Sequence, residues 1–284
     1  MPGFENASGR QILKSLNPYI LKLFGRSVLL AAAVAVGACE MSLSNLTGRA
    51  TDEWTRSYPL PANGEVQITN TNGKVEIEGV DGVTVDVRAE RVARAATEAA
   101  ARELLPRISI KEDIRPDRVA LETERLSGIL IGVSVEVRYQ VRVPKTALVR
   151  VRTTNGAITV IALSGRVVAS TTNGVITGTD LRGDVEARAT NGRVAIDLAS
   201  LGSDLVDLRT TNGSVQLTLP DTAKATLSAT CTNGAIDVSG LKLDLMGEQS
   251  RRRVRGRLNG GGTPVELTTT NGAIHVRLRG ATGG

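Results

Sequence analysis

Side chains that could do chemistry are few in this chain. Its 284 residues include a single histidine, His275, and two cysteines, Cys39 and Cys231. A protein metal site takes three or four ligands, most often His, Cys or carboxylate, so these three residues alone cannot build one. The sequence contains no Ser-His-Asp set, phosphate-binding glycine loop or calcium-loop pattern. It therefore predicts no catalytic residue, no metal and no cofactor.

Cys39 is the residue with the most specific predicted modification. Four basic residues between positions 10 and 26 precede an apolar run at 27–38. The run has the length of a signal-peptide hydrophobic region and is too short to span a bilayer as a helix. It ends in Val36-Gly37-Ala38-Cys39, which resembles the bacterial lipobox. The alternatives are a plain secretory signal and a buried apolar helix.

The lipobox resemblance implies cleavage before Cys39 and lipidation of its thiol. Residues 1–38 would then be a lipoprotein signal peptide and residues 39–58 a tether, and lipid would hold the protein to a membrane. Only Cys231 would remain free, so no intramolecular disulfide could form. The next residue is Glu40, and the lack of Asp there favours the outer membrane or cell surface in a cell with two membranes.

Five arginines lie close together near the C-terminus, in a stretch predicted as a loop at about 241–262. They are Arg251, Arg252, Arg253, Arg255 and Arg257. One interpretation is a solvated loop. The other is a contact with anionic lipid or polysaccharide, because each arginine near a charged surface contributes about 1 kcal/mol. The formal net charge of +6 comes partly from the N-terminal basic residues and gives no argument for nucleic acid.

A repeated tripeptide dominates the rest of the sequence. Thr-Asn-Gly occurs seven times, with its asparagine at Asn72, Asn155, Asn173, Asn191, Asn212, Asn233 and Asn271. From Asn155 onward the steps are 18, 18, 21, 21 and 38 residues. A fixed period of about 20 residues is typical of a solenoid. Apolar and polar residues alternate on both sides of each tripeptide, so each unit is predicted to be two strands joined by an Asn-Gly turn.

Two architectures fit this pattern. Asn-Gly is a strong hairpin signal, which allows an antiparallel meander or sandwich. A hairpin has no reason to keep one period and one phase along the chain, whereas a stack of coils does. We therefore predict an all-β, parallel β-helix or solenoid built from coils of 18–21 residues. Stacking would place the seven asparagines about 4.8 Å apart, close enough for a ladder of side-chain hydrogen bonds.

The solenoid domain is predicted at 59–284, with two interruptions. The first is an insert at about 84–147, where the apolar spacing of 92–105 predicts a helix that Pro106 stops. The insert would cover an open end or flank of the solenoid, because exposed strand edges invite aggregation. The second interruption is the arginine-bearing loop. Strands are predicted in the insert at about 107–112, 118–124 and 133–143.

The order of these motifs resembles a bacterial family of β-strand repeats known as "putative adhesins", a domain of unknown function. The matching features are the Asn-Gly units, Tyr139-x-Val141-x-Val143-Pro144 before the second unit, and the Leu258-to-Gly262 stretch before the last. The resemblance covers about 60–280. It implies a right-handed β-helix-like fold, often exported or anchored, and offers no catalytic residues. The adhesin name rests on fold analogy, which does not fix function.

The predicted function is a membrane-anchored binding or structural module of the cell envelope, adhesin-like and without catalysis. Its partners would be the membrane, through the lipid anchor, and envelope glycans or proteins. One alternative is a polysaccharide-acting β-helix enzyme, which would need paired carboxylates. The candidates Asp197, Asp237, Glu76 and Glu186 are scattered over different units. The other alternative is an accessory protein of envelope-stress signalling.

Overall fold

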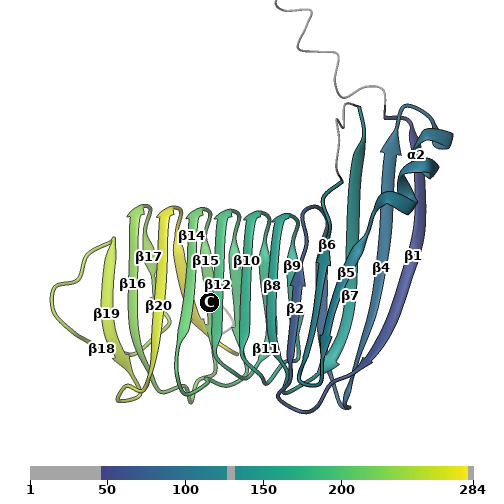
Figure 1. Cartoon of the computed structure of the whole chain (residues 1–284). Coiled ribbons are helices and arrows are strands. Elements are labelled where there is room, and N and C mark those ends of the chain that lie inside the picture. The colour runs from purple at the N-terminus through teal and green to yellow at the C-terminus, as the bar shows by residue number, and fades with distance from the viewer. Residues whose placement is uncertain (1–45, 127–131, 281–284) are drawn as a thin grey trace, which may run out of the picture.

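Two β-sheets face each other and run the length of a rod, with β1 at one end and the pair β18–β19 at the other (Figure 1). The computed structural model describes residues 46–126 and 132–280. The predicted signal peptide and Cys39 therefore lie outside the described residues.

The strands keep a fixed order in each sheet. Sheet A consists, from the N-terminal end of the rod, of β1 (Gly48–Pro59), β4 (Thr84–Ala95), β7 (Ser134–Pro144), β3 (Val75–Val80), β9 (Ile158–Ile161), β11 (Ile176–Leu181), β13 (Val194–Leu198), β15 (Val215–Leu219), β21 (Ile274–Leu278) and β17 (Ile236–Asp237). Sheet B consists, in the same direction, of β5 (Ile110–Arg115), β6 (Arg118–Thr123), β2 (Glu65–Thr69), β8 (Leu148–Asn155), β10 (Val167–Asn173), β12 (Val185–Asn191), β14 (Val206–Asn212), β20 (Thr263–Asn271), β16 (Ala225–Asn233), β19 (Arg253–Leu258) and β18 (Leu243–Leu245). The helical elements are α2 (Glu98–Leu104) and the short 3₁₀ turn η1 (Leu105–Arg107).

The coils of the repeat stack in parallel and in phase. In sheet B, Asn173 pairs with Asn155 on one side and with Asn191 on the other. In sheet A, Ile176 pairs with Ile158 and with Val194 in the same way. An antiparallel meander or sandwich would reverse direction from strand to strand. The fold is therefore a parallel β-solenoid, and the antiparallel alternative is excluded.

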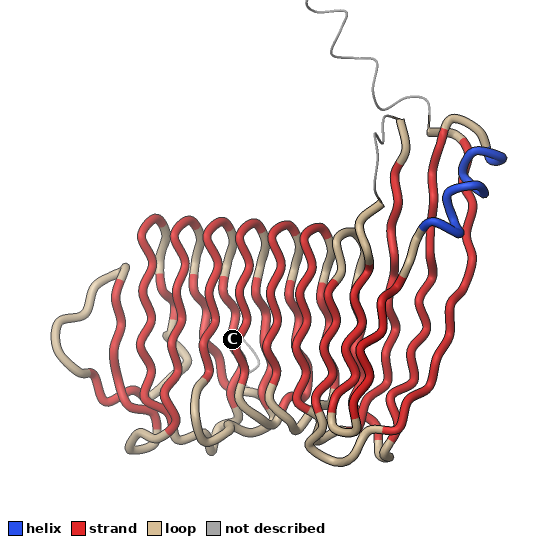
Figure 2. Tube along the Cα trace, viewed as in Figure 1, coloured by secondary structure: helices blue, strands red, loops and turns tan. Residues whose placement is uncertain are grey.

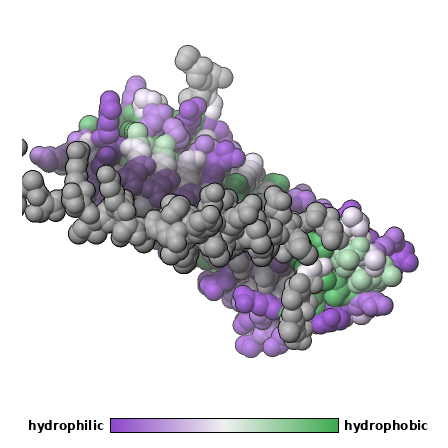
Figure 3. Space-filling view, turned by 90° about the horizontal axis from the view of Figure 1, so that it is seen from above, coloured by the Kyte–Doolittle hydropathy of each residue, from purple (hydrophilic) through white to green (hydrophobic). Residues whose placement is uncertain are grey.

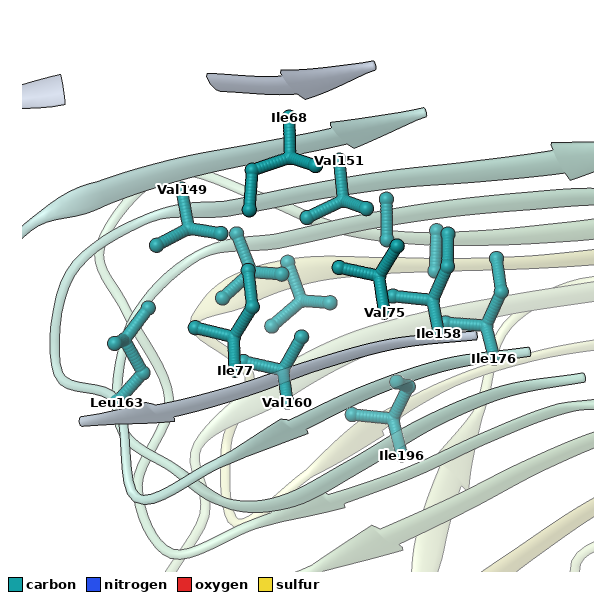
Figure 4. Packing of buried hydrophobic residues seen from close by; sticks show 14 of the residues in the cluster. Ile68, Val75, Ile77, Val149, Val151, Ile158, Val160, Leu163, Ile176 and Ile196 are labelled. Carbon is teal, nitrogen blue, oxygen red and sulfur yellow. The ribbon is translucent and has the colours of Figure 1, made fainter. Parts of the chain in front are cut away.

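Aliphatic side chains from every second strand position fill the interior. Val149 and Val151 of sheet B and Ile158 and Val160 of sheet A are at most 2 % exposed (Figure 4). Burying each such side chain contributes roughly 1.5–3 kcal/mol. Ordering the backbone costs about 1–2 kcal/mol per residue, so one coil cannot be stable alone. The coils hold together because each one covers its neighbours.

The glycine of each tripeptide is required by the closeness of successive coils. A Cβ atom at Gly174 would lie 2.0 Å from the carbonyl oxygen of Gly156, and one at Gly213 would lie 2.2 Å from that of Gly192. Non-bonded heavy atoms do not approach so closely. Any side chain at these positions would push two coils apart, so stacking itself selects glycine.

Further strands extend both sheets at the N-terminal end, and those of sheet A are long. β1 is antiparallel to β4 and β4 to β7, and parallel pairing resumes between β7 and β3. β5 and β6 extend sheet B in the same direction. Helix α2 packs against β1 and β4, at the top of the rod in Figure 1. The inserted segment thus lies across the N-terminal end of the solenoid.

Two predictions for this region are wrong. Most of the predicted tether is strand, because residues 48–58 pair one by one with β4. The helix predicted from residue 92 starts later, since 92–95 belong to β4 and Thr97 caps α2 by accepting a hydrogen bond from the N–H of Ala100. The apolar residues of this stretch suit a helix or a strand, and pairing with β1 and β7 on both sides decides for the strand.

The last two coils stack in the reverse of their order in the chain. The β20–β21 coil lies between the β14–β15 coil and the β16–β17 coil in both sheets. After β15 the chain therefore passes over one coil position, forms the outermost coil and then β18 and β19, and returns so that β20 and β21 occupy the position it had passed over (Figure 2).

The stretch predicted as a loop at 241–262 also needs correction. It contains β18 and β19, which pair with each other and continue sheet B beyond β16 in antiparallel fashion. The sequence of β19 alternates exposed arginines with Val254, Gly256 and Leu258, which face inward. The high charge of this stretch conceals a strand pattern with one buried face.

Candidate functional site

The seven predicted asparagines lie in single file along one edge of the rod. Each side-chain Nδ2 donates to the Oδ1 of the next residue at 2.7–2.8 Å, in the order Asn233, Asn271, Asn212, Asn191, Asn173, Asn155, Asn72. Asn72 in turn donates to the carbonyl oxygen of Val135 at 3.2 Å. All the amides point towards the N-terminal end, so the bonds polarise one another. This asparagine ladder joins the coils and carries no catalytic group.

A second row of hydrogen bonds lies just inside the ladder, at positions that the sequence marks only as small. In three coils a buried threonine donates its hydroxyl hydrogen to a glycine carbonyl oxygen of the neighbouring coil at 2.8–3.0 Å: Thr171 to Gly156, Thr210 to Gly192 and Thr269 to Gly213. Cys231 takes this position in the outermost coil and is 3 % exposed. Burial raises the pKa of its thiol, so the sulfur stays protonated and is a poor nucleophile.

Ion pairs cover the outer face of sheet B near the middle of the rod. The side chain of Asp207 is only 3 % exposed and accepts hydrogen bonds from Arg188 at 3.0 Å and Arg209 at 2.6 Å. Glu186 and Glu266 flank it in register on the adjacent strands and pair with the same two arginines. The bond to Asp207 raises the pKa of Arg209. Ion pairs with arginine engage all three carboxylates, which therefore serve structure.

The structure does not bring the four candidate catalytic carboxylates together. Glu76, Asp197 and Asp237 lie on β3, β13 and β17 of sheet A, and Glu186 lies on β12 of sheet B. Glu76 pairs with Lys74 at 2.7 Å, and Asp197 pairs with Arg279 at 2.9 Å.

Asp237 is the carboxylate nearest to the lone histidine. It accepts hydrogen bonds from the hydroxyl and the N–H of Ser239, which hold its pKa below the usual range. His275 Nδ1 lies 3.5 Å from Asp237 Oδ2, on the surface of sheet A. Within residues 46–126 and 132–280, no group of three His, Cys, Asp or Glu side chains could hold a metal ion.

The five arginines occupy the C-terminal end of the rod. Arg253, Arg255 and Arg257 alternate along the outer face of β19 and are exposed. The carbonyl oxygens of Arg251 and Arg252 accept hydrogen bonds from the N–H groups of Ile236 and Cys231, which closes the last coil. In the part of the chain that the structure describes, none of the five guanidinium groups forms an ion pair.

The opposite end differs in both charge and aromatic content. Arg91 donates to Asp52 at 2.8 and 2.5 Å and to the carbonyl oxygen of Ile108 at 2.9 Å. Tyr139 is fully buried, and burial raises its pKa to about 12.

Seen from above, the coloured part of the surface is mainly hydrophilic, and hydrophobic residues gather towards the right-hand end (Figure 3). None of the helices among the described residues is long and apolar enough to cross a membrane.

These features define a class of protein: a parallel β-solenoid whose described residues present hydrogen-bonded and charged rows and no assembled catalytic group. The chain belongs to the Toastrack DUF4097 family, whose model matches residues 108–277. The comparison with curated proteins yields no match.

Several solved structures are similar to this chain at low sequence identity. A putative cell adhesion protein from Clostridium sporogenes is 13 % identical, with a TM-score of 0.48 over 81 % of this chain and 100 % of that one. A putative adhesin from Bacteroides fragilis is 9 % identical, with a TM-score of 0.27 over 80 % and 97 % of the two chains. A putative adhesin from Parabacteroides distasonis is 9 % identical, with a TM-score of 0.26 over 81 % and 98 %.

Proposed function

We propose that the protein is a binding module of the cell envelope, held to a membrane by lipid on Cys39 and without catalytic activity. The rod itself is the observation that carries the proposal. Its two long sheets present polar side chains at alternate positions, as in β8 and β12. Solenoids use such extended faces to bind macromolecules. The pairing of Glu76, Asp197 and Glu186 with basic side chains supports a non-catalytic role.

The position of β1 supports an anchor at the N-terminal end. β1 begins at Gly48, nine residues after Cys39, and lies at the edge of sheet A. Nine extended residues span at most about 30 Å. A lipid on Cys39 would therefore hold the N-terminal end of the rod near the membrane surface and leave the C-terminal end free to reach a partner.

The anchor is tested by Cys39→Ala in the full chain. We expect cells supplied with labelled fatty acid to label the wild-type protein and not the variant, and the variant to move to the soluble fraction. Cys231→Ala is the matched control and should keep both label and membrane association, because its thiol is buried. Equal labelling of Cys39→Ala and wild type would contradict the proposal that Cys39 carries the lipid.

The absence of catalysis is tested separately. The purified full chain is incubated with envelope polysaccharides, and their chain length is followed by size-exclusion chromatography. We expect no change. Cleavage of any polymer would contradict the proposal and return attention to the carboxylates on the outer faces of the sheets.

A further inference from the structure

The outer face of β19 carries three arginines that have no ion-pair partner among the described residues. Arg253, Arg255 and Arg257 occupy alternate exposed positions and form what we term the β19 arginine row. Alternate residues of a strand are about 6.7 Å apart, so the row presents three positive charges over roughly 13 Å. Asp244 lies opposite Arg257 in β18 without pairing with it. The planar guanidinium donors are therefore available to an outside anion.

A row of hydroxyl groups runs beside the arginines. Thr226, Ser228 and Thr230 of β16 are half-buried and lie in register with Arg257, Arg255 and Arg253. Paired strands are about 4.8 Å apart. Arg255 Nε lies 3.5 Å from Ser228 Oγ, which shows that the two rows are within reach of one ligand. The Thr226 hydroxyl already hydrogen-bonds the backbone of Gly262 at 3.4 Å. The hydroxyls of Ser228 and Thr230 can donate to anionic oxygens or accept from sugar hydroxyls, so this face combines charge with hydrogen bonding suited to a glycan.

The reversed order of the last two coils places this surface at the end of the rod. If the coils followed chain order, β18 and β19 would branch from the side between two coils. Instead, β19 pairs with the outermost coil and lies nine strand positions from β5, or about 43 Å. The arginine row is thus far from β1, where the chain enters the rod.

The positions of the aromatic residues disfavour two kinds of partner at this surface. Within the described part of the chain, Trp54, Tyr58 and Tyr139 are the aromatic side chains, and they lie on β1 and β7 at the other end. Proteins that bind single-stranded nucleic acid stack its bases on aromatic rings. An uncharged sugar would likewise find no aromatic ring at β19 on which to stack. Recognition at β19 must therefore depend on charge and hydrogen bonds.

We propose that the β19 arginine row and the hydroxyls of β16 bind an anionic envelope glycan, a polymer that carries carboxylate or phosphate on successive units. Recognition of the anion follows from the unpaired arginines. The choice of a glycan over a lipid headgroup rests on the proposed function, since β19 lies about 43 Å along the rod from the end that the anchor would hold at the membrane.

Binding by the purified full chain tests the proposal with four probes. Polygalacturonate supplies carboxylates and poly(glycerol phosphate) supplies phosphates, while dextran is the uncharged control. Vesicles of phosphatidylglycerol and phosphatidylcholine represent a lipid surface. We expect one or both anionic polymers to bind, with affinity falling steeply as salt rises, and dextran not to bind. Binding to neither polymer would overturn the proposal. The surface would then be assigned to lipid if vesicles that contain phosphatidylglycerol bind more tightly than vesicles of phosphatidylcholine alone, since the lipid on Cys39 would insert into both.

Two triple variants with the same loss of net charge locate the site. One changes Arg253→Ser, Arg255→Ser and Arg257→Ser. The control changes Arg152→Ser, Arg193→Ser and Arg277→Ser, three exposed arginines elsewhere on the rod that also lack an ion pair among the described residues. We expect the first to weaken polymer binding on the order of a hundredfold at low salt, and the control by less than about threefold. Equal weakening by both would mean that net charge alone attracts the polymer, and the site would be wrong.

Discussion

The two ends of the rod use arginine in opposite ways. At the N-terminal end, Arg91 of β4 faces Asp52 of β1, and the two side chains share two hydrogen bonds. At the C-terminal end, Arg255 of β19 faces Ser228 of β16, with no carboxylate close enough to pair within the described residues. Both arginines are on antiparallel strands that extend a sheet beyond the parallel coils. What differs is the residue paired with the arginine on the neighbouring strand, which is Asp52 for Arg91 and Ser228 for Arg255.

This difference separates an arginine that is paired within the fold from arginines that have no ion-pair partner among the described residues. The side chain of Arg91 is 20 % exposed, so its charge needs compensation from within the chain. The β19 arginines are exposed and hydrated, and they cost little while unpaired. Arg91 thus has a carboxylate across the strand pair β1–β4, whereas Arg255, where we propose that an anion binds, has a hydroxyl across the strand pair β16–β19.

Removing one partner at each end tests the comparison most strongly. Asp52→Ala leaves the half-buried guanidinium of Arg91 with only the carbonyl oxygen of Ile108 as acceptor. We expect it to lower the free energy of unfolding by about 2–3 kcal/mol in urea titrations. Arg255→Ser should change that free energy by less than about 0.5 kcal/mol. Similar losses for the two variants would show that the β19 arginines also hold the fold together.

Alkaline pH should weaken the N-terminal end selectively. Tyr139 has a pKa of about 12 in the folded chain because it is fully buried, with its hydroxyl 2.8 Å from Thr123 Oγ1. The unfolded tyrosine titrates at about 10, so the unfolded state loses its proton first. The stabilisation is complete below about pH 10 and is lost as pH rises towards 12. At pH 11 the loss is about 1.4 kcal/mol.

The variant Tyr139→Phe isolates this effect, because it removes the ionisable group and keeps the ring. The free energy of unfolding is measured at about pH 9 and about pH 11 for both chains. The wild type should lose about 1.4 kcal/mol more than the variant between these values. An equal loss in both would assign the alkaline sensitivity to other groups.

The repeat made the solenoid predictable from sequence. Seven tripeptides in one phase, with alternating apolar residues around them, admit few arrangements other than stacked coils. The close contact between successive glycines, such as Gly174 on Gly156, then follows from the stacking. The repeated coils are predictable because each one carries the same pattern, a Thr-Asn-Gly turn between two strands of alternating apolar residues.

The two ends were not predictable in this way, because neither repeats. Strand β1 looks like a polar tether, since seven of its twelve residues are exposed and its pairing with β4 joins residues far apart in the chain. The two coils with reversed order contain the same Thr-Asn-Gly tripeptide as the other coils. Nothing in the sequence around Asn271 therefore indicates that Asn271 lies between Asn212 and Asn233. The arginines of β19 lie at the end of the rod because of this reversal, so their position could not be predicted from the sequence either.

The asparagine ladder offers a finer comparison, between the middle of the rod and its C-terminal end. Asn191 donates to Asn173 and accepts from Asn212, whereas Asn233 donates to Asn271 and has no asparagine beyond it. Asn191→Ala removes two hydrogen bonds and breaks a polarised chain, so we expect a loss of about 1 kcal/mol in thermal or urea unfolding. Asn233→Ala should cost about half as much. Val194→Asp, at a site with 0 % exposure, should cost far more than either, because it buries a charge in the core. If Asn233→Ala costs as much as Asn191→Ala, the number of ladder bonds removed does not set the loss of stability, and the end of the ladder is no weaker than its middle.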